Sequence, residues 1–145
     1  MKIGIYAGSF NPFHKGHYNI LCKAEQIFDK VIIVKGVNPD KSPSTYDIHS
    51  IETLKDRFIL EYDGLLTDIV NHAKSTADNV TLIRGLRNSV DLQYEMNQYR
   101  YLQDLMPDIQ MVSIFCDKEF EHISSSGIRT LSKYGSEKVQ DYLLL

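Results

Sequence analysis

A chain of 145 residues in which 43% are hydrophobic and 24% are charged has the composition of one soluble globular domain, which we expect to extend over residues 1–145. The net charge of −3 disfavours general nucleic-acid binding, and the longest apolar runs are too short to span a membrane. Two cysteines in apolar contexts, Cys22 and Cys116, and the lack of a signal peptide lead us to expect reduced thiols in a cytoplasmic protein.

The beginning of the chain predicts a strand, a glycine-rich turn and a helix in immediate succession. Residues 2–7 have strand character, and residues 18–28 carry apolar side chains at helical spacing. The turn between them reads Gly-Ser-Phe-Asn-Pro-Phe-His-Lys-Gly-His over residues 8–17. Ligands of parallel sheets bind beyond the carboxyl ends of the strands, and free N–H groups at a helix start bind phosphate. The turn therefore predicts a nucleotide or phosphate site.

Two histidines mark the end of this turn. His14 and His17 are three residues apart, so they can share one side of the helix entrance and reach the same anion. Taken alone, such a pair is more often two exposed side chains of a turn. A zinc site is disfavoured because no Cys, Asp or Glu lies nearby to complete a coordination shell.

The rest of the chain alternates strands with helices. Continuous apolar runs at residues 31–34 and 80–83 are typical of buried parallel strands. The other predicted elements are, in order, a short helix at 51–55, a strand at 57–62, helices at 65–73 and 90–105, a strand at 109–115, a helix opened by serines 124–126, and two short helices between 132 and 145. This alternation predicts an α/β protein with a five-stranded, largely parallel sheet flanked by helices.

Two arginines follow the predicted strand at residues 80–83. Arg84 and Arg87 bracket Gly85, and Asn88 or Ser89 can cap the helix that comes next. The planar guanidinium group matches phosphate oxygens and keeps its charge under all relevant conditions. A pair of arginines at the carboxyl edge of the sheet is therefore better explained by phosphate binding than by a solvated surface.

Several other groups have two interpretations each. Lys41, in an irregular loop beside the first turn, is either solvated or a phosphate ligand. Glu95 can meet a ribose hydroxyl or pair with an arginine, and the serines at 124–126 are either helix caps or phosphate ligands. The many aromatic residues of the helix at 90–105 favour a second buried face, and hence a contact between subunits.

Three separated blocks of sequence agree in what they resemble. They read G-S-F-N-P-F-H-K-G-H at residues 8–17, R-G-L-R-N-S-V-D-L-Q-Y-E-M-N at 84–97, and E-F-E-H-I-S-S-S-G-I-R at 119–129. Together they resemble the Rossmann-like nucleotidyltransferase superfamily with an (H/T)-x-G-H signature. More narrowly, the second block is similar to that of the phosphopantetheine adenylyltransferases of coenzyme A synthesis.

This resemblance implies transfer of AMP from ATP to 4′-phosphopantetheine with Mg²⁺, giving dephospho-coenzyme A and pyrophosphate. It assigns catalysis to His17, Lys41 and Arg87, and acceptor binding to Ser9, Lys41, Leu66 and Arg84. The ATP ligands that it implies are Ser9, Phe10, His14, His17, Gly85, Leu86, Arg87, Glu95, Phe120, Glu121, His122, Ile123, Ser124, Ser125 and Ser126. It assigns no metal ligand to the chain itself, and it implies a homo-oligomer, commonly a hexamer.

The chain departs from the family pattern at three places. Asn11 stands where aspartate is usual, and His14 stands where threonine is common. The segment from Ser42 to Phe58 is shorter than in the family and lacks its usual helix. His14 and the short segment favour an alternative, an adenylyl- or cytidylyltransferase for another phosphorylated acceptor such as nicotinamide mononucleotide. A non-catalytic nucleotide-binding or regulatory protein is disfavoured, because binding alone would not need His17, Lys41, Arg87 and the serine run together.

Overall fold

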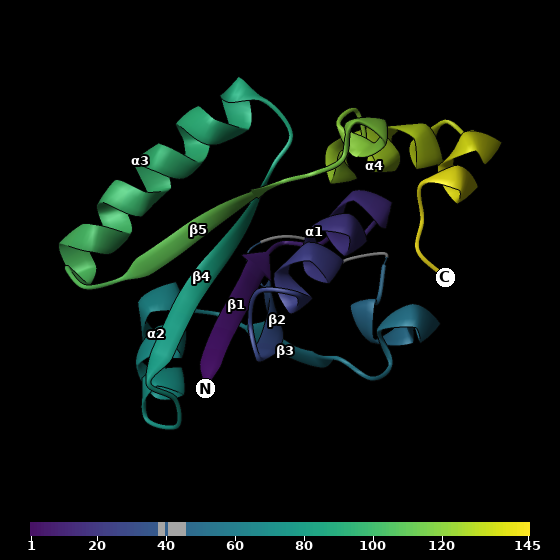
Figure 1. The fold of residues 1–145 in the computed structure, drawn as a ribbon. Coiled ribbons are helices and arrows are strands. Elements are labelled where there is room, and N and C mark those ends of the chain that lie inside the picture. Colours follow the sequence, from purple (N-terminus) through teal and green to yellow (C-terminus); the bar gives the residue numbers. More distant parts are fainter. Residues whose placement is uncertain (38–39, 41–45) are drawn as a thin grey trace.

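The computed structural model describes residues 1–37, 40 and 46–145 of the chain (Figure 1). Its strands are β1 (Lys2–Gly8), β2 (Lys30–Gly36), β3 (Phe58–Tyr62), β4 (Asn79–Leu86) and β5 (Gln110–Phe115). Its α-helices are α1 (Lys15–Glu25), α2 (Leu66–Lys74), α3 (Ser89–Leu105) and α4 (Ser125–Lys133). Short 3₁₀ helices are η1 (Ile48–Ser50), η2 (Glu52–Leu54), η3 (Lys118–Phe120) and η4 (Glu137–Asp141).

Within the described residues, the strands form one five-stranded sheet in the order β3-β2-β1-β4-β5, and every neighbouring pair is parallel. The prediction of an α/β protein with a parallel sheet is confirmed. The chain leaves β1 toward β2 on one side and reaches β4 on the other side. The sheet therefore has its switch point at β1, and a crevice for ligands is expected beyond the carboxyl ends of β1 and β4.

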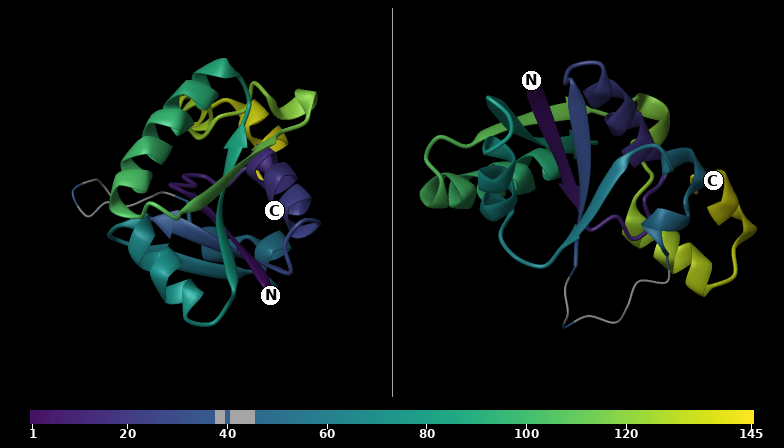
Figure 2. Two further views of the ribbon diagram at one scale, coloured as in Figure 1. Left: turned by 60° about the vertical axis from the view of Figure 1, so that its left-hand side comes forward. Right: turned by 90° about the horizontal axis from the view of Figure 1, so that it is seen from below.

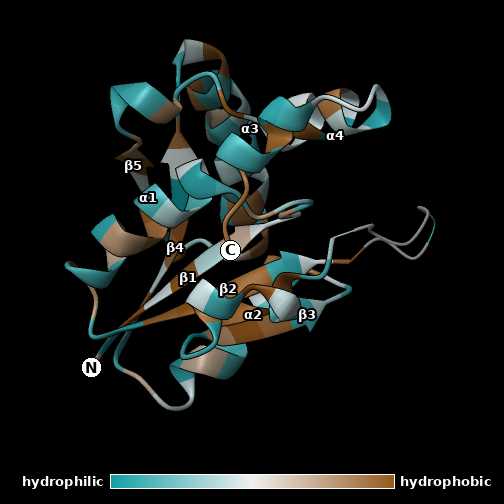
Figure 3. Ribbon diagram, turned by 90° about the vertical axis from the view of Figure 1, so that its right-hand side faces the viewer, coloured by the Kyte–Doolittle hydropathy of each residue, from teal (hydrophilic) through white to brown (hydrophobic). Residues whose placement is uncertain are grey.

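Alternate residues of each strand face two hydrophobic layers. In β1, Ile5 packs in the layer that contains Val70 of α2, whereas Tyr6 packs in the layer that contains Leu21 of α1. The left-hand view of Figure 2 shows α2 and α3 on one side of the strands and α1 on the other. Hydrophobic colour is concentrated on the strands and hydrophilic colour on outer helical turns (Figure 3). The central strands β1, β2 and β4 are thus buried on both faces, as continuous apolar strands require, whereas the edge strands β3 and β5 are largely exposed.

The structure corrects three local predictions. Helix α1 begins at Lys15, before the predicted range, because His14 caps it. The predicted short helix at 51–55 is instead the 3₁₀ helix η2, preceded by η1. The prediction of two terminal helices is wrong: η4 is followed by an extended end, in which Leu143 pairs with His14.

In the described ranges, each helix is too short or too polar to cross a lipid bilayer.

Candidate active site

A cavity of about 370 Å³ opens at the carboxyl ends of β1 and β4, where the topology places a ligand crevice. Its walls come from the turn after β1, the start of α1, the end of β4, the first turns of α3 and the segment at residues 116–129. This volume is in the range of pockets that bind small molecules. Segments far apart in the sequence therefore enclose one site of nucleotide size.

The cavity brings together most residues that the resemblance assigned to ATP or the acceptor. Those that line it are Ser9, Phe10, His14, His17, Arg84, Gly85, Leu86, Arg87, Glu95, Phe120, Ile123, Ser124, Ser125 and Ser126. Three others do not line it: Leu66 packs against the core under α2, and Glu121 and His122 are exposed. The His122 ring lies against Tyr142. Lys41 lies outside the described residues.

The two histidines are held by hydrogen bonds within the turn. His14 is the N-cap of α1, and its Nδ1 accepts a hydrogen bond from the Gly16 N–H at 3.0 Å. The Nδ1 of His17 accepts one from the His14 N–H at 3.1 Å. Their rings stack with centroids 3.7 Å apart. Because both Nδ1 atoms are acceptors, each neutral imidazole carries its proton on Nε2.

Both imidazoles are kept neutral. Burial, and then the positive charge of Arg87, lower the pKa of His14 to about 4. Burial lowers the pKa of His17 well below its ordinary value, with further lowering by His14, Arg87 and Arg84. At neutral pH the pair therefore provides two uncharged N–H donors. A neutral donor polarises a phosphate oxygen without adding a proton that must be removed later.

The backbone at this helix start differs from the prediction of free N–H groups. The N–H of Lys15 donates to the Tyr142 carbonyl at 3.0 Å, and that of Gly16 donates to His14. For these two groups the prediction is wrong, because the C-terminal segment and the histidine cap already satisfy them. The imidazole Nε2–H groups are the donors that remain beside them.

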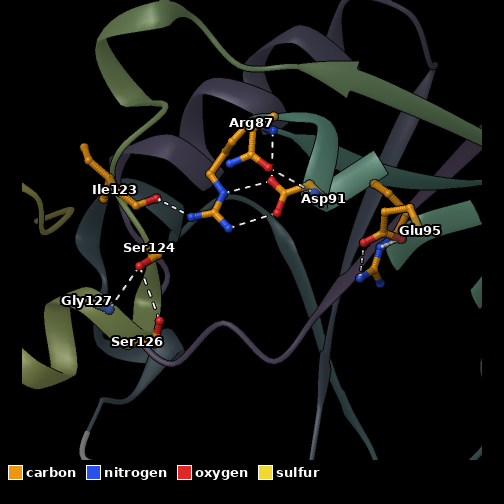
Figure 4. A network of polar contacts seen from close by, with 9 residues as sticks. Arg87, Asp91, Glu95, Ile123, Ser124, Ser126 and Gly127 are labelled. Carbon is orange, nitrogen blue, oxygen red and sulfur yellow. Dashed lines mark hydrogen bonds and ion pairs between the residues drawn. The ribbon is translucent and has the colours of Figure 1, made fainter. Parts of the chain in front are cut away.

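The two arginines of β4 and its following turn are each held by a carboxylate (Figure 4). Arg84 contacts Glu95 through Nη2–Oε1 and Nε–Oε2, both at 2.9 Å, and donates to the Ala7 carbonyl at 3.1 Å. Of the two interpretations of Glu95, the structure therefore shows the pairing with an arginine. Only 7% of Glu95 is exposed, so the buried charge is compensated by a bidentate partner.

Arg87 is held by Asp91, one helical turn later. Its Nε and Nη2 donate to the two carboxylate oxygens at 2.9 and 3.0 Å, and its Nη1 donates to the Ile123 carbonyl at 3.3 Å. Burial alone would raise the pKa of the Asp91 carboxyl, but the hydrogen bonds from Arg87 keep this pKa below its usual range. Arg87 thus links the start of α3 to the segment before α4, with its guanidinium in a fixed orientation.

The serine run is both a helix cap and part of the cavity wall. Ser124 caps α4 by accepting from the Gly127 N–H at 3.0 Å, and its Oγ lies 3.4 Å from that of Ser126 (Figure 4). Ser125 donates to the Pro12 carbonyl at 2.8 Å, which ties α4 to the first turn. The structure shows the helix cap, and the serines also line the cavity, so phosphate binding by them stays a prediction.

Several lining residues were not assigned to the site from the sequence, among them Asp91, Tyr94 and Arg129. Asp91 stands four residues after Arg87. This is the spacing of an ion pair within a helix, so the pair could have been predicted from the sequence. Arg129 follows the serine run, and its Nη1 donates to the Asn11 carbonyl at 2.6 Å. Tyr94 lines the mouth although 57% of it is exposed. For Tyr94 and Arg129, no local pattern indicated which way the side chain would face.

The sequence is similar to that of curated relatives over nearly its whole length. It is 39% identical to the phosphopantetheine adenylyltransferase of Mycoplasma capricolum subsp. capricolum, over 92% of this chain and 99% of that one. It is 34% identical to the enzyme of that name from Streptococcus pneumoniae, over 94% of this chain and 86% of that one. A family model described as cytidylyltransferase-like matches residues 5–60.

Solved structures agree on the fold. A nicotinate-nucleotide adenylyltransferase candidate from Vibrio parahaemolyticus superposes with a TM-score of 0.68 at 17% identity, over 99% of this chain and 94% of that one. A bifunctional NMN adenylyltransferase/ADP ribose pyrophosphatase from Francisella tularensis gives a TM-score of 0.63 at 19% identity, over 98% and 44% of the two chains. At these identities the likeness shows a shared Rossmann-like nucleotidyltransferase fold. The identity to the curated relatives goes further, and by it this chain belongs to the phosphopantetheine adenylyltransferase family.

Proposed function

We propose that this chain transfers AMP from ATP to 4′-phosphopantetheine, giving dephospho-coenzyme A and pyrophosphate. The observation that carries the proposal is the cavity at the switch point, where the neutral histidine pair and the carboxylate-held arginines line one space. Family membership supports the choice of both substrates.

The chemistry needs donors rather than a base. A phosphate oxygen of the acceptor, already ionised at neutral pH, attacks the α-phosphorus of ATP, and the bond from that phosphorus to the pyrophosphate oxygen breaks. Negative charge moves toward the pyrophosphate, so catalysis depends on positioning and on charge stabilisation. The low pKa of His17 suits this role, because an uncharged imidazole donates through Nε2 throughout the reaction. We assign the contact with the α-phosphate to His17.

The arginine side would neutralise the charge of the reacting phosphates. Arg87 is held on one side by Asp91, and we propose that it contacts ATP phosphates, together with Lys41. Arg84, held by Glu95, together with Ser9, faces the acceptor phosphate in this scheme. An arginine whose orientation is fixed before binding loses less side-chain entropy when the phosphate arrives.

The ATP molecule would extend from the turn after β1 to the start of α4. We propose that the hydroxyl groups of Ser125 and Ser126 bind its β- and γ-phosphates, and that Ser9 and Phe10 contact it through the turn. We propose that its nucleoside lies against Gly85, Leu86, Glu95 and residues 120–123. Of these residues, all but Glu121 and His122 line the cavity. Leu66 completes the proposed acceptor contacts, from outside the cavity wall.

We propose that Mg²⁺ enters bound to ATP. Among residues 1–37, 40 and 46–145, no three His, Cys, Asp or Glu side chains are grouped so as to hold a metal ion. The cavity carboxylates Asp91 and Glu95 already bind arginines. Mg²⁺ prefers phosphate and water oxygens, so the triphosphate itself is its ligand, and the ion neutralises part of the triphosphate charge.

The exposed faces of α3 support assembly into a homo-oligomer. Val90, Tyr94 and Tyr101 are 75%, 57% and 69% exposed on one flank of the helix, and Leu92 and Met96 are 44% and 46% exposed on another. Glu95 is the one buried residue of this helix. We propose that α3 forms contacts between subunits, in a hexamer as the resemblance implies, and that the enzyme acts in the cytoplasm. Light scattering should give a multiple of the chain mass, and Tyr101→Glu should lower it; a monomeric wild type would refute this assembly.

The deciding experiment measures pyrophosphate release from Mg·ATP with 4′-phosphopantetheine or with nicotinamide mononucleotide at equal concentration. We expect turnover with 4′-phosphopantetheine and little with the mononucleotide. Turnover with the mononucleotide alone would identify it as the acceptor, which is the alternative that His14 and the short segment after Lys41 favour. Release that depends on neither acceptor would contradict adenylyl transfer.

A further inference from the structure

A polar cluster joins α1 to the chain just after β5. The Asp117 carboxylate lies 2.8 Å from Lys23 Nζ and accepts a hydrogen bond from Asn19 Nδ2 at 2.9 Å. The Asp117 N–H donates to Asn19 Oδ1 at 2.8 Å, and Lys23 Nζ also donates to the Phe115 carbonyl at 2.6 Å. We call Asn19, Lys23 and Asp117 the α1–β5 clamp. Its four contacts connect residues that are more than 90 positions apart in the sequence.

The side chain of Asp117 does not cap the 3₁₀ helix η3 that follows it. It occupies the N-cap position of η3, where an aspartate side chain ordinarily accepts from the helix backbone, but it makes no capping hydrogen bond there. Its carboxylate binds α1 instead. The hydrogen bonds from Lys23 and then Asn19 lower the pKa of Asp117, so the carboxylate is ionised at neutral pH. The interaction is therefore charge-assisted as well as bidentate.

The clamp connects two segments that both contribute to the cavity lining. Helix α1 contributes His17 and Ile20 to one wall, and Asn19 stands between them in the sequence. The segment that starts at Asp117 contributes Phe120 and Ile123 to the other wall. Asn19 and Asp117 themselves are not lining residues. The clamp thus ties the helix that carries Ile20 to the segment that carries Phe120 and Ile123.

We propose that the α1–β5 clamp sets the width of the slot that holds the nucleotide base, with Asp117 as a positioning residue. This inference rests on the proposed function, since it takes the apolar part of the cavity as the base-binding part. A flat ring gains dispersion contacts on both faces only when the walls are one ring thickness apart, and a small gap loses much of that attraction. The proposed phosphate ligands His17 and Arg87 are oriented by their own hydrogen bonds with His14 and Asp91, so we expect the clamp to act on the base.

The chain contains a matched control. Lys74 of α2 contacts Asp108 at 3.0 Å, so this pair also joins a helix to the end of β5. It lies at the amino end of that strand, and neither residue lines the cavity. Loss of either pair removes one lysine–aspartate contact from the same strand. Only loss of the clamp is expected to change the binding of the base.

The experiment compares ATP with inorganic tripolyphosphate, which has the phosphates but no base. Titration calorimetry on the full chain should show that Asp117→Ala weakens ATP binding roughly three- to tenfold, the range for losing an exposed ion pair with its hydrogen bond, and leaves tripolyphosphate binding unchanged. KM for ATP should rise at constant kcat. Asp117→Asn keeps the hydrogen bonds to Asn19 and should retain most of the affinity. Asp108→Ala should change neither ligand's binding.

Three outcomes would overturn the clamp proposal. Equal losses for ATP and tripolyphosphate would show that Asp117 supports the whole site rather than the base slot. An equal effect of Asp108→Ala would show a general effect on stability. If Asp117→Ala leaves ATP binding unchanged, the clamp has no role in base binding, and the proposed function is unaffected. A wild type that binds tripolyphosphate but not ATP would refute the proposed function, and the base slot with it.

Discussion

The two sides of the cavity are held in place by different physical means. On the histidine side, His14 is buried and His17 is partly buried; the two rings are stacked and neutral, and their partners are backbone N–H groups of the same turn. On the arginine side, Arg84 and Arg87 keep their charge and are oriented by the carboxylates of α3. Each side is organised by hydrogen bonds within the chain.

This difference separates local from long-range determinants of the site. The histidine side is specified by a few consecutive residues, so its chemistry is sensitive to burial and to acid. The arginine side depends on the ion pairs of Arg84 with Glu95 and of Arg87 with Asp91, so it is sensitive to loss of charge. The following predictions test this contrast.

Among these predictions, replacement of Arg87 should have the largest effect, a decrease in kcat/KM. Arg87→Ala removes both a phosphate ligand and the partner of Asp91, and we expect a loss of about 3–4 kcal/mol of transition-state stabilisation, like that of an oxyanion donor. Steady-state pyrophosphate release measures it through kcat/KM. Arg57→Ala is the matched control, because Arg57 pairs with Glu25 at 3.2 Å and lines no part of the cavity. Near wild-type turnover of Arg87→Ala would remove Arg87 from the catalytic set.

Mild acid should destabilise the fold through the histidine side. The pKa of His14 is near 4 in the folded chain and near 6.5 when unfolded, so the unfolded state binds the proton first. The stabilisation is therefore complete above pH 6.5 and is lost as the pH falls toward 4. For one histidine, unfolding free energy should drop by about 2 kcal/mol between pH 7.5 and 5.

Urea unfolding at the two pH values measures this loss, and His14→Asn should reduce it by about 2 kcal/mol. His72→Asn, at an exposed position of α2, is the control and should leave the loss unchanged. The same pH dependence in wild type and His14→Asn would show that this histidine is not buried as a neutral group.

Removal of the cap should have a smaller effect on stability. His14→Ala deletes the side chain that accepts from Gly16, and helix capping predicts a loss of about 1 kcal/mol. His14→Asn retains an acceptor suited to an N-cap and should restore most of that loss. Thermal or urea unfolding at pH 7.5 compares the two variants. Equal stability of His14→Ala and wild type would mean that the cap contributes nothing to the fold.

The smallest effect is expected when the arginine is kept and its partner changed. Asp91→Asn leaves an acceptor for Arg87 but removes the charge that orients it, and we expect roughly a fivefold decrease in kcat/KM, close to one exposed ion pair. Increased salt should weaken the wild type toward the variant. A decrease as large as that of Arg87→Ala would instead indicate direct contact of Asp91 with a substrate or its metal ion.

The chain by itself determined the α/β class, the order of strands and helices, and the location of the site, because apolar periodicity and the turn motifs are local properties of consecutive residues. It also left Glu95 open between two roles, and it did not indicate Asp91, Arg129 or the clamp residue Asp117. Arg129 and Asp117 depend on contacts between elements that only folding brings together, whereas the Arg87–Asp91 pair has the local spacing of a helical ion pair.

The helix start after β1 shows the same division. Its residues predict phosphate-binding N–H groups, but the carbonyl of Tyr142, almost at the other end of the chain, accepts from Lys15. The Nε2 proton of each histidine follows from which nitrogen accepts a backbone N–H, and that depends on ring orientation in the packed turn. Sequence determined which groups are present. Tertiary structure decided which of them remain available to a ligand, because each buried donor or acceptor must first find its partner within the fold.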